Sequence, residues 1–222
     1  MHLLDPAPFG RIIPAMITPM KADGSIDYSA AQRIAKQLVA DGADGILVNG
    51  TTGESPVTHM DEKVDLVRAV KEVVDVPVIS GAGSNDTAHS VRMAEQTQEA
   101  GVDAVLVVAP YYSRPSQEGI FQHYRAVNAS ADKPIIVYDV PGRTGVRIQL
   151  DTYRRLAELD HVTAVKAATR AIAHRRLDQP LPGAARFREL GDTLAAMEEL
   201  RQSLAQSLSR QWAMEQQRSR TL

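Results

Sequence analysis

One lysine of this chain stands where its amine could act as a nucleophile. Lys166 ends the apolar run Val162 to Val165, whereas the other lysines fall in loops or on helical stretches. Burial at a strand end disfavours the ammonium form and lowers the pKa of a lysine. The neutral amine can then attack a ketone or aldehyde to form a Schiff base. The competing interpretation is an ammonium group that extends past the strand end into water.

A second group of residues could hold a small carboxylate. Gly50-Thr51-Thr52-Gly53-Glu54 directly follows the apolar run Gly45 to Val48. Glycines allow a sharp turn that brings backbone N–H groups toward a ligand, and the two threonine hydroxyls add further donors. An ordinary turn that caps a helix would have the same composition. This motif therefore predicts a carboxylate site only together with the others.

Proton transfer and a second carboxylate contact could come from two further loops. Tyr138 ends the run Pro134 to Tyr138, and Arg143 follows it closely. A phenol can pass on a proton when another group completes the relay, and an arginine can hold a carboxylate through two hydrogen bonds. Tyr112 occupies the equivalent loop after the run Ala104 to Val108. Each tyrosine taken alone is more commonly a packing residue.

The elements that must position these residues are predicted by their periodicity. Short, almost wholly apolar runs alternate with segments of helical period, which is typical of parallel strands covered on both faces. The runs are Ile12 to Thr18, Gly45 to Val48, Val76 to Ile79, Ala104 to Val108, Pro134 to Tyr138 and Val162 to Val165. The candidate residues then lie at the carboxyl ends of strands, where active sites of parallel α/β folds form. The pattern alone leaves an open sheet and a closed barrel as alternatives.

A repeated motif supports the assignment of βα units. Gly42-Ala43-Asp44 precedes one predicted strand, and Gly101-Val102-Asp103 precedes another. Repeated βα units with short connections indicate a parallel sheet with right-handed crossovers.

Composition restricts the class of protein. The 222 residues carry a formal net charge of -2 and are 44% hydrophobic, which is usual for a globular chain and gives no reason to expect nucleic acid or a membrane surface as a partner. Cysteine is absent, and the six histidines show no paired ligand spacing, so neither thiol chemistry nor a metal site is expected. With no recognisable signal peptide and no apolar run of about 20 residues, we expect a cytoplasmic protein.

In combination and in this order, the motifs resemble those of the dihydrodipicolinate synthase / N-acetylneuraminate lyase superfamily of (β/α)8 barrels. The resemblance runs from about Arg11 to Thr169. It rests on Pro14-Ala15-Met16-Ile17-Thr18-Pro19, Gly50-Thr51-Thr52-Gly53-Glu54, Pro110-Tyr111-Tyr112, Tyr138-Asp139-Val140-Pro141 and Val165-Lys166. The paired threonines and Arg143 are similar to the dihydrodipicolinate synthase branch. The resemblance implies condensation of pyruvate with L-aspartate 4-semialdehyde, the entry to lysine and diaminopimelate synthesis.

The same resemblance implies how the substrates are held. Lys166 would form the imine with pyruvate. Thr52 and the neighbouring amides, including that of Gly53, would hold the pyruvate carboxylate. The imine would act as an electron sink, so that the methyl group loses a proton and attacks the semialdehyde, whose carboxylate would rest on Arg143.

Proton transfer and assembly are implied as well. Tyr138, Thr51 and Tyr112 would form the proton relay, with Tyr112 supplied by a neighbouring subunit. The family resemblance implies a homotetramer built as a dimer of dimers. It implies no metal and no organic cofactor.

The sequence changes character after Thr169. The remainder has no lysine and nine of the chain's nineteen arginines, and its leucines are spaced like one face of a long helix. We therefore expect a TIM-barrel-like catalytic region over residues 1–169 and an arginine-rich helical tail over residues 170–222. Six strands are predicted where a (β/α)8 barrel has eight. The expected fold is α/β, a TIM barrel left incomplete at about six βα units, as a frameshift or aberrant gene end would produce.

Departures from the family leave alternatives open. Ala167 and Arg170 stand where the family usually has an acidic residue and a glycine. The chain could be a non-catalytic remnant that folds in part or binds intact subunits. Among enzymes, the alternative is another pyruvate-dependent aldolase that acts on a sugar acid, against which Arg143 argues. Lys63 and His89 stand where lysine-inhibited members carry a histidine and a glutamate, so we expect weak lysine feedback.

Overall fold

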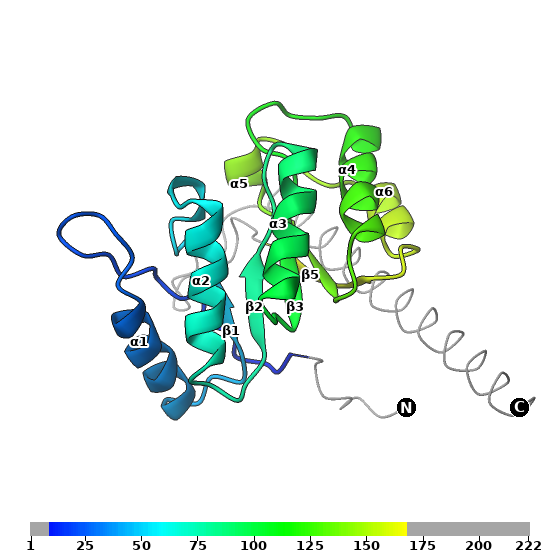
Figure 1. Ribbon diagram of the computed structural model, residues 1–222. Coiled ribbons are helices and arrows are strands. Elements are labelled where there is room, and N and C mark those ends of the chain that lie inside the picture. The colour runs from blue at the N-terminus through cyan, green and yellow to red at the C-terminus, as the bar shows by residue number, and fades with distance from the viewer. Residues whose placement is uncertain (1–8, 168–222) are drawn as a thin grey trace, which may run out of the picture.

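A parallel sheet with helices between its strands forms the body of the molecule (Figure 1). The structure is a computed structural model that describes residues 9–167, so the predicted helical tail over residues 170–222 lies outside the described residues. The five strands follow one another in the order β1-β2-β3-β4-β5. Their bounds are β1 Ile46–Val48, β2 Val78–Gly81, β3 Ala104–Val108, β4 Ile135–Asp139 and β5 Val162–Ala167.

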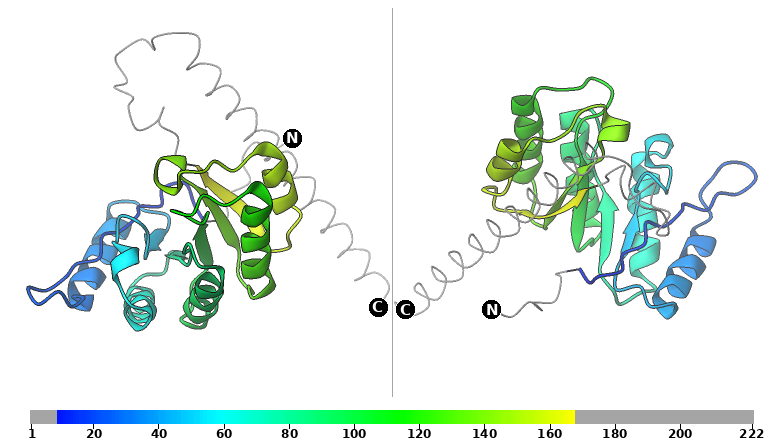
Figure 2. Two further views of the ribbon diagram at one scale, coloured as in Figure 1. Left: turned by 90° about the horizontal axis from the view of Figure 1, so that it is seen from above. Right: turned by 180° about the vertical axis from the view of Figure 1, so that it is seen from behind.

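Helices line the outer side of this curved sheet, as the view from above shows (Figure 2). Each helix contacts its neighbours in the layer, and three of the helices begin after a side-chain N-cap, at Asp27, Asp86 and Ser116. The helices are α1 Tyr28–Ala40, α2 Met60–Lys71, α3 Thr87–Glu99, α4 Gln117–Ala129 and α6 Leu150–Leu156, with the short η1 Ser55–Val57 and α5 Pro141–Thr144 in the loops. The incomplete α/β barrel expected from the sequence is thus the observed architecture.

The first predicted strand is correct in place and wrong in extent. Within Ile12 to Thr18, only Ala15 bridges to the sheet, in parallel with Leu47. The contact consists of Met16 N–H donating to the Leu47 carbonyl at 2.9 Å and Leu47 N–H donating to the Pro14 carbonyl at 3.0 Å. Proline has no N–H to donate, so Pro14 and Pro19 restrict the ladder to this short bridge beside β1.

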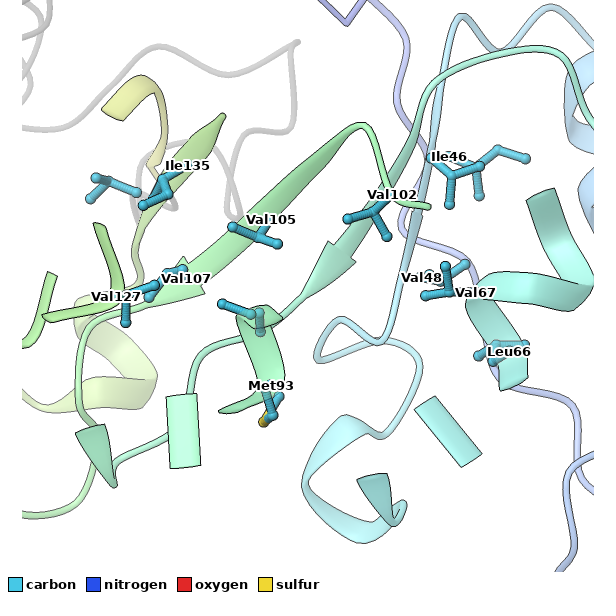
Figure 3. Close-up of a cluster of buried hydrophobic side chains, with 14 of the residues drawn as sticks. Ile46, Val48, Leu66, Val67, Met93, Val102, Val105, Val107, Val127 and Ile135 are labelled. Atoms are coloured by element: carbon cyan, nitrogen blue, oxygen red, sulfur yellow. The ribbon is translucent and has the colours of Figure 1, made fainter. Parts of the chain in front are cut away.

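The core has two parts, one on each face of the sheet. Between sheet and helices, buried residues such as Val67, Met93, Val105 and Ile135 pack together (Figure 3). On the opposite face, a second buried cluster contains Leu47, Ile79, Leu106, Ile136 and Tyr138. The nearly continuous apolar runs of the strands follow from burial on both faces.

The repeated Gly-x-Asp motif has a structural explanation. Gly42 and Gly101 end helices in the left-handed region, with φ of 99° and 95°, which costs glycine little. Each following aspartate then accepts hydrogen bonds from the start of the preceding strand segment. Asp44 Oδ2 accepts from the Ile12 amide at 2.9 Å, and Asp103 Oδ2 accepts from the Val78 amide at 2.7 Å. The motif therefore ties neighbouring βα units together at the amino-terminal edge of the sheet.

Candidate active site

Lys166 and Tyr138 lie side by side on neighbouring strands. Their Cα atoms are register partners in the β4–β5 ladder, and Lys166 Nζ lies 4.7 Å from the centre of the Tyr138 ring. Tyr138 is buried in the second cluster, on the sheet face opposite the helices, which we call the inner cluster. A tyrosine face stabilises a nearby ammonium. The predicted nucleophile and the predicted proton-transfer residue are therefore brought together by backbone pairing.

A local irregularity fixes this register. Ile135 pairs with Val162, but Ile136 pairs with Ala164, so Thr163 is an extra residue in β5. Such a bulge changes which side chains face each side of the sheet beyond it. Ala164 packs on the inner cluster and Val165 on the helix-facing cluster, so Lys166 shares the inner face with Tyr138.

Burial shifts the protonation equilibrium of Lys166 toward its neutral amine. Lys166 is half-buried in β5, and this desolvation lowers the pKa of its amine below the usual lysine value. Among the described residues, no carboxylate forms an ion pair with its ammonium group. A larger fraction of the amine is therefore uncharged, which is the form that attacks a carbonyl carbon.

The threonine pair lies on an anchored loop after β1. The Gly53 carbonyl accepts a hydrogen bond from Thr18 Oγ1 at 2.7 Å, and a Cβ on Gly53 would come within 2.9 Å of that oxygen. Thr51 and Thr52 are exposed. The loop therefore exposes Thr51 and Thr52 to solvent at the carboxyl end of the sheet, which suits the binding of a small anion.

Tyr112 extends away from the described part of the chain. Its side chain is 87% exposed, and its backbone adopts a left-handed φ of 70°. That conformation is rare for a bulky residue and is commonly associated with functional loops. The loop after β3 therefore presents the Tyr112 phenol outward, and nothing in the described residues joins it to Tyr138.

Arg143 is exposed on the short α5, which follows β4 directly. Thr144 holds this turn through hydrogen bonds from its Oγ1 to the Val146 carbonyl at 2.8 Å and the Val140 carbonyl at 3.2 Å. Gly145 ends the turn with a φ of 72°. Within residues 9–167 the Arg143 guanidinium has no hydrogen-bond or ion-pair partner, so it can bind an anion from a turn whose backbone is well fixed.

A buried pair that was not predicted from the sequence involves Asp139, the residue that follows Tyr138. Asp139 is 6% exposed, and its Oδ2 accepts a hydrogen bond from the Tyr153 hydroxyl at 2.8 Å. Desolvation raises the pKa of the Asp139 carboxyl, and burial beside that carboxyl raises the pKa of the Tyr153 phenol. An aspartate inside an otherwise apolar strand was the available signal, because a carboxyl group there needs a donor.

The described residues hold no cluster of three or more histidine, cysteine or acidic side chains that could bind a metal. In the same part of the chain, no helix is long and apolar enough to cross a membrane.

Comparison with known proteins assigns the motifs to one family. The model of the dihydrodipicolinate synthetase family matches residues 8–180. The 4-hydroxy-tetrahydrodipicolinate synthase of Bifidobacterium animalis subsp. lactis is 82% identical over 173 residues, which are 78% of this chain and 57% of that protein. The chain thus spans a little over half the length of this relative.

Solved structures agree with this assignment. A dihydrodipicolinate synthase from Bacillus anthracis superposes with a TM-score of 0.70 at 47% identity, over 72% of this chain and 56% of that one. The enzyme from Acinetobacter baumannii, solved as a complex with pyruvate, gives a TM-score of 0.69 at 37% identity, over 71% and 55% of the two chains.

Proposed function

This chain belongs to the dihydrodipicolinate synthetase family, and from that premise we propose that it catalyses the condensation of pyruvate with L-aspartate 4-semialdehyde. One observation carries the proposal, namely that the half-buried amine of Lys166 lies over the ring of Tyr138 at the carboxyl end of the sheet. A desolvated lysine beside a phenol fits a nucleophile with a proton donor and acceptor at hand.

The first half-reaction makes the nucleophile. The neutral Lys166 amine attacks the ketone carbon of pyruvate, and loss of water leaves an imine. Thr52 holds the pyruvate carboxylate, which the exposure of both threonines supports. Gly53 fixes this turn, since its N–H donates to the Gly50 carbonyl at 3.1 Å and its carbonyl accepts from Thr18 Oγ1. The protonated imine accepts electrons when the methyl group loses a proton, and this gives an enamine.

The second half-reaction joins the substrates. The enamine carbon attacks the aldehyde carbon of the semialdehyde, whose carboxylate is held by Arg143. Tyr138, Thr51 and Tyr112 pass protons to and from the reacting oxygens. Hydrolysis of the new imine releases the product and regenerates the Lys166 amine.

A second subunit completes the relay in this proposal. The 87% exposure of Tyr112 supports donation of its hydroxyl to a neighbouring copy of the chain, as expected for a homotetramer built from dimers. We also propose that residues 1–169 form the catalytic region and that residues 170–222 form a separate helical tail.

The experiment is borohydride reduction in the presence of pyruvate, followed by peptide mass spectrometry on the 222-residue chain. We expect a pyruvate-derived adduct on Lys166, lost in Lys166→Met and retained in the control Lys71→Met, because Lys71 forms an ion pair with Asp103 on the outer layer. A folded chain that gives no adduct would be a non-catalytic member of the family, and the proposal would be wrong.

Substrate choice is tested separately. A carboxylate on the aldehyde substrate fits Arg143, which is exposed on a fixed turn five residues after Tyr138. We expect turnover with the semialdehyde to exceed turnover with sugar-acid aldehydes, and Arg143→Gln to reduce this preference. Equal rates with both classes would favour the sugar-acid alternative.

A further inference from the structure

Lys63 is a buried lysine for which the proposed reaction has no use. It lies in α2 with 4% of its surface exposed. Its ammonium donates to the Thr58 carbonyl and, at 2.8 Å, to Thr58 Oγ1. Among the described residues, no carboxylate forms an ion pair with it. Burial lowers the pKa of its amine, partly offset by the charges of Glu62 and Asp61.

The backbone of the same residue holds the other end of the loop. Asn49 Nδ2 donates to the Lys63 carbonyl at 3.1 Å and to Ser80 Oγ at 2.9 Å. Asn49 directly follows β1 and its backbone adopts a left-handed conformation, with a φ of 53°. The absent Cβ of Gly81 would fall 2.0 Å from the Asn49 carbonyl oxygen, so the backbone here is closely packed against β2.

Residues 49–58 are therefore a loop with both ends attached to one residue. The Lys63 carbonyl holds Asn49, and the Lys63 side chain holds Thr58. The middle of the loop is attached at a third point, where Thr18 Oγ1 donates to the Gly53 carbonyl. Thr51 and Thr52 lie between these attachments and are themselves exposed.

We propose that Lys63 is a positioning residue that holds the loop of residues 49–58 in the conformation that binds the pyruvate carboxylate. This inference rests on the proposed function. Burial of an ammonium without a carboxylate partner costs desolvation free energy. Methionine has a similar length and would fill the same space without the charge. What lysine provides is a donor that reaches across to Thr58 and closes the loop from the helix side.

The consequence is confined to substrate binding. Donors that bind a substrate must be held by the residues behind them, and loss of such support lowers affinity while the reacting groups stay in place. Lys166 and Tyr138 lie on β5 and β4, outside the loop that Lys63 closes. Loosening the loop should therefore raise the pyruvate concentration needed for imine formation without preventing it.

The test compares Lys63→Met with Lys71→Met, a matched control on the same helix whose ammonium is bound to Asp103 at 2.9 Å. The first readout is the dependence of borohydride trapping at Lys166 on pyruvate concentration. We expect Lys63→Met to raise the half-saturating concentration about tenfold with maximal trapping retained, and the control to leave it unchanged.

The second readout is hydrogen exchange of the amides of residues 50–57 other than Pro56, a measurement that requires no activity. In Lys63→Met these amides should exchange about tenfold faster or more, while amides of β2 and β4 keep their rates. Thr58→Val removes the hydroxyl that accepts from Lys63 and donates to the Ser55 carbonyl at 3.2 Å, but it leaves the Thr58 carbonyl as an acceptor for Lys63. It should therefore give a smaller effect than Lys63→Met, and the effect of the double variant should be less than the sum of the two.

The outcomes separate this inference from the proposed function. Without an adduct in the unsubstituted chain, the proposed function fails, and the exchange comparison alone decides whether Lys63 closes the loop. Unchanged loop exchange in Lys63→Met overturns the inference, as does faster exchange throughout the sheet. A loosened loop with an unchanged half-saturating pyruvate concentration shows that the attachment is structural only, and this also overturns it.

Discussion

Strands β4 and β5 are hydrogen-bonded neighbours, yet their surroundings differ. All five residues of β4 are buried, whereas in β5 only Val162 is buried and the other five are half-buried. Tyr138 belongs to β4 and Lys166 to β5. The proposed active site therefore joins a strand fixed by packing on both faces to one that is positioned mainly by its pairing with β4.

This difference shows what each strand contributes. Packing in a close-fitting core gives β4 a rigid position, and the ladder transfers that position to β5. A nucleophile on the half-buried strand keeps access to water and substrate, while its desolvation is still sufficient to lower the pKa of its amine. The comparison predicts that stability depends on β4 and its helices, and that β5 tolerates change away from Lys166.

The largest expected effect tests the two strands directly. Val137 and Val165 are register partners on the helix-facing side, but Val137 is fully buried and Val165 is half-buried. We expect Val137→Ala to lower the free energy of unfolding by about 2–3 kcal/mol and Val165→Ala by about 1 kcal/mol. Chemical denaturation of both variants measures this difference, and equal losses would contradict the distinction between the strands.

A buried histidine in the helix layer should make the free energy of unfolding fall at acid pH. His123 of α4 is 2% exposed, and burial lowers the pKa of its imidazole to about 4. Its Nδ1 is hydrogen-bonded to Thr87 Oγ1 of α3 at 2.9 Å. The negative charge of Asp86 offsets part of the lowering of the pKa.

Because the folded protein disfavours the protonated His123, stability is fully present above the unfolded pKa, near 6.5, and is lost as the pH falls toward 4. We expect a loss of about 2 kcal/mol between pH 7 and pH 5 from this residue. His123→Asn retains a partner for Thr87 and should remove this part of the pH dependence in denaturation at several pH values. An unchanged slope would mean that other groups cause it.

A smaller effect of opposite sign is expected from Asp139 on β4. Its folded pKa is raised by burial, despite the Tyr153 hydroxyl, the Ile148 amide and the charge of Arg147. The stability that this group contributes is present below its unfolded pKa and is lost as the pH rises through the folded pKa. Asparagine has the same shape and can still accept from Tyr153.

Asp139→Asn should therefore raise the free energy of unfolding by about 1 kcal/mol at pH 7, with no gain near pH 4. Thermal melts at both pH values provide the measurement. Tyr153→Phe is the control, because it removes the donor at 2.8 Å and should be destabilising at pH 7. A loss of stability in Asp139→Asn at pH 7 would show that the carboxylate is well satisfied.

The same contrast explains what could be predicted from the sequence. The buried strands were predictable because burial on both faces leaves continuous apolar runs, and β3 lies over Ala104–Val108, as expected. The first strand was predicted too long because hydrophobicity does not record the missing N–H groups of Pro14 and Pro19. Placement of Lys166 opposite Tyr138 depends on the extra residue Thr163 in β5, and no local pattern marks a register shift. The Asp139–Tyr153 pair required knowledge of which helix packs on β4.

The smallest expected effect is that of free lysine on imine formation. Lys63 and His89 lie on the neighbouring helices α2 and α3. Lys63 is buried with its ammonium already bound to Thr58, and a lysine ligand would bring a further positive charge toward it. An effector shifts activity only if it binds one state of the protein better than another. The Lys63 side chain offers a cationic ligand a positive charge in place of a carboxylate.

Titration of lysine against pyruvate trapping at Lys166 should therefore change the half-saturating pyruvate concentration less than about twofold. Inhibition at micromolar lysine would contradict this, and it would show that a signal from α2 and α3 reaches β5 through the sheet.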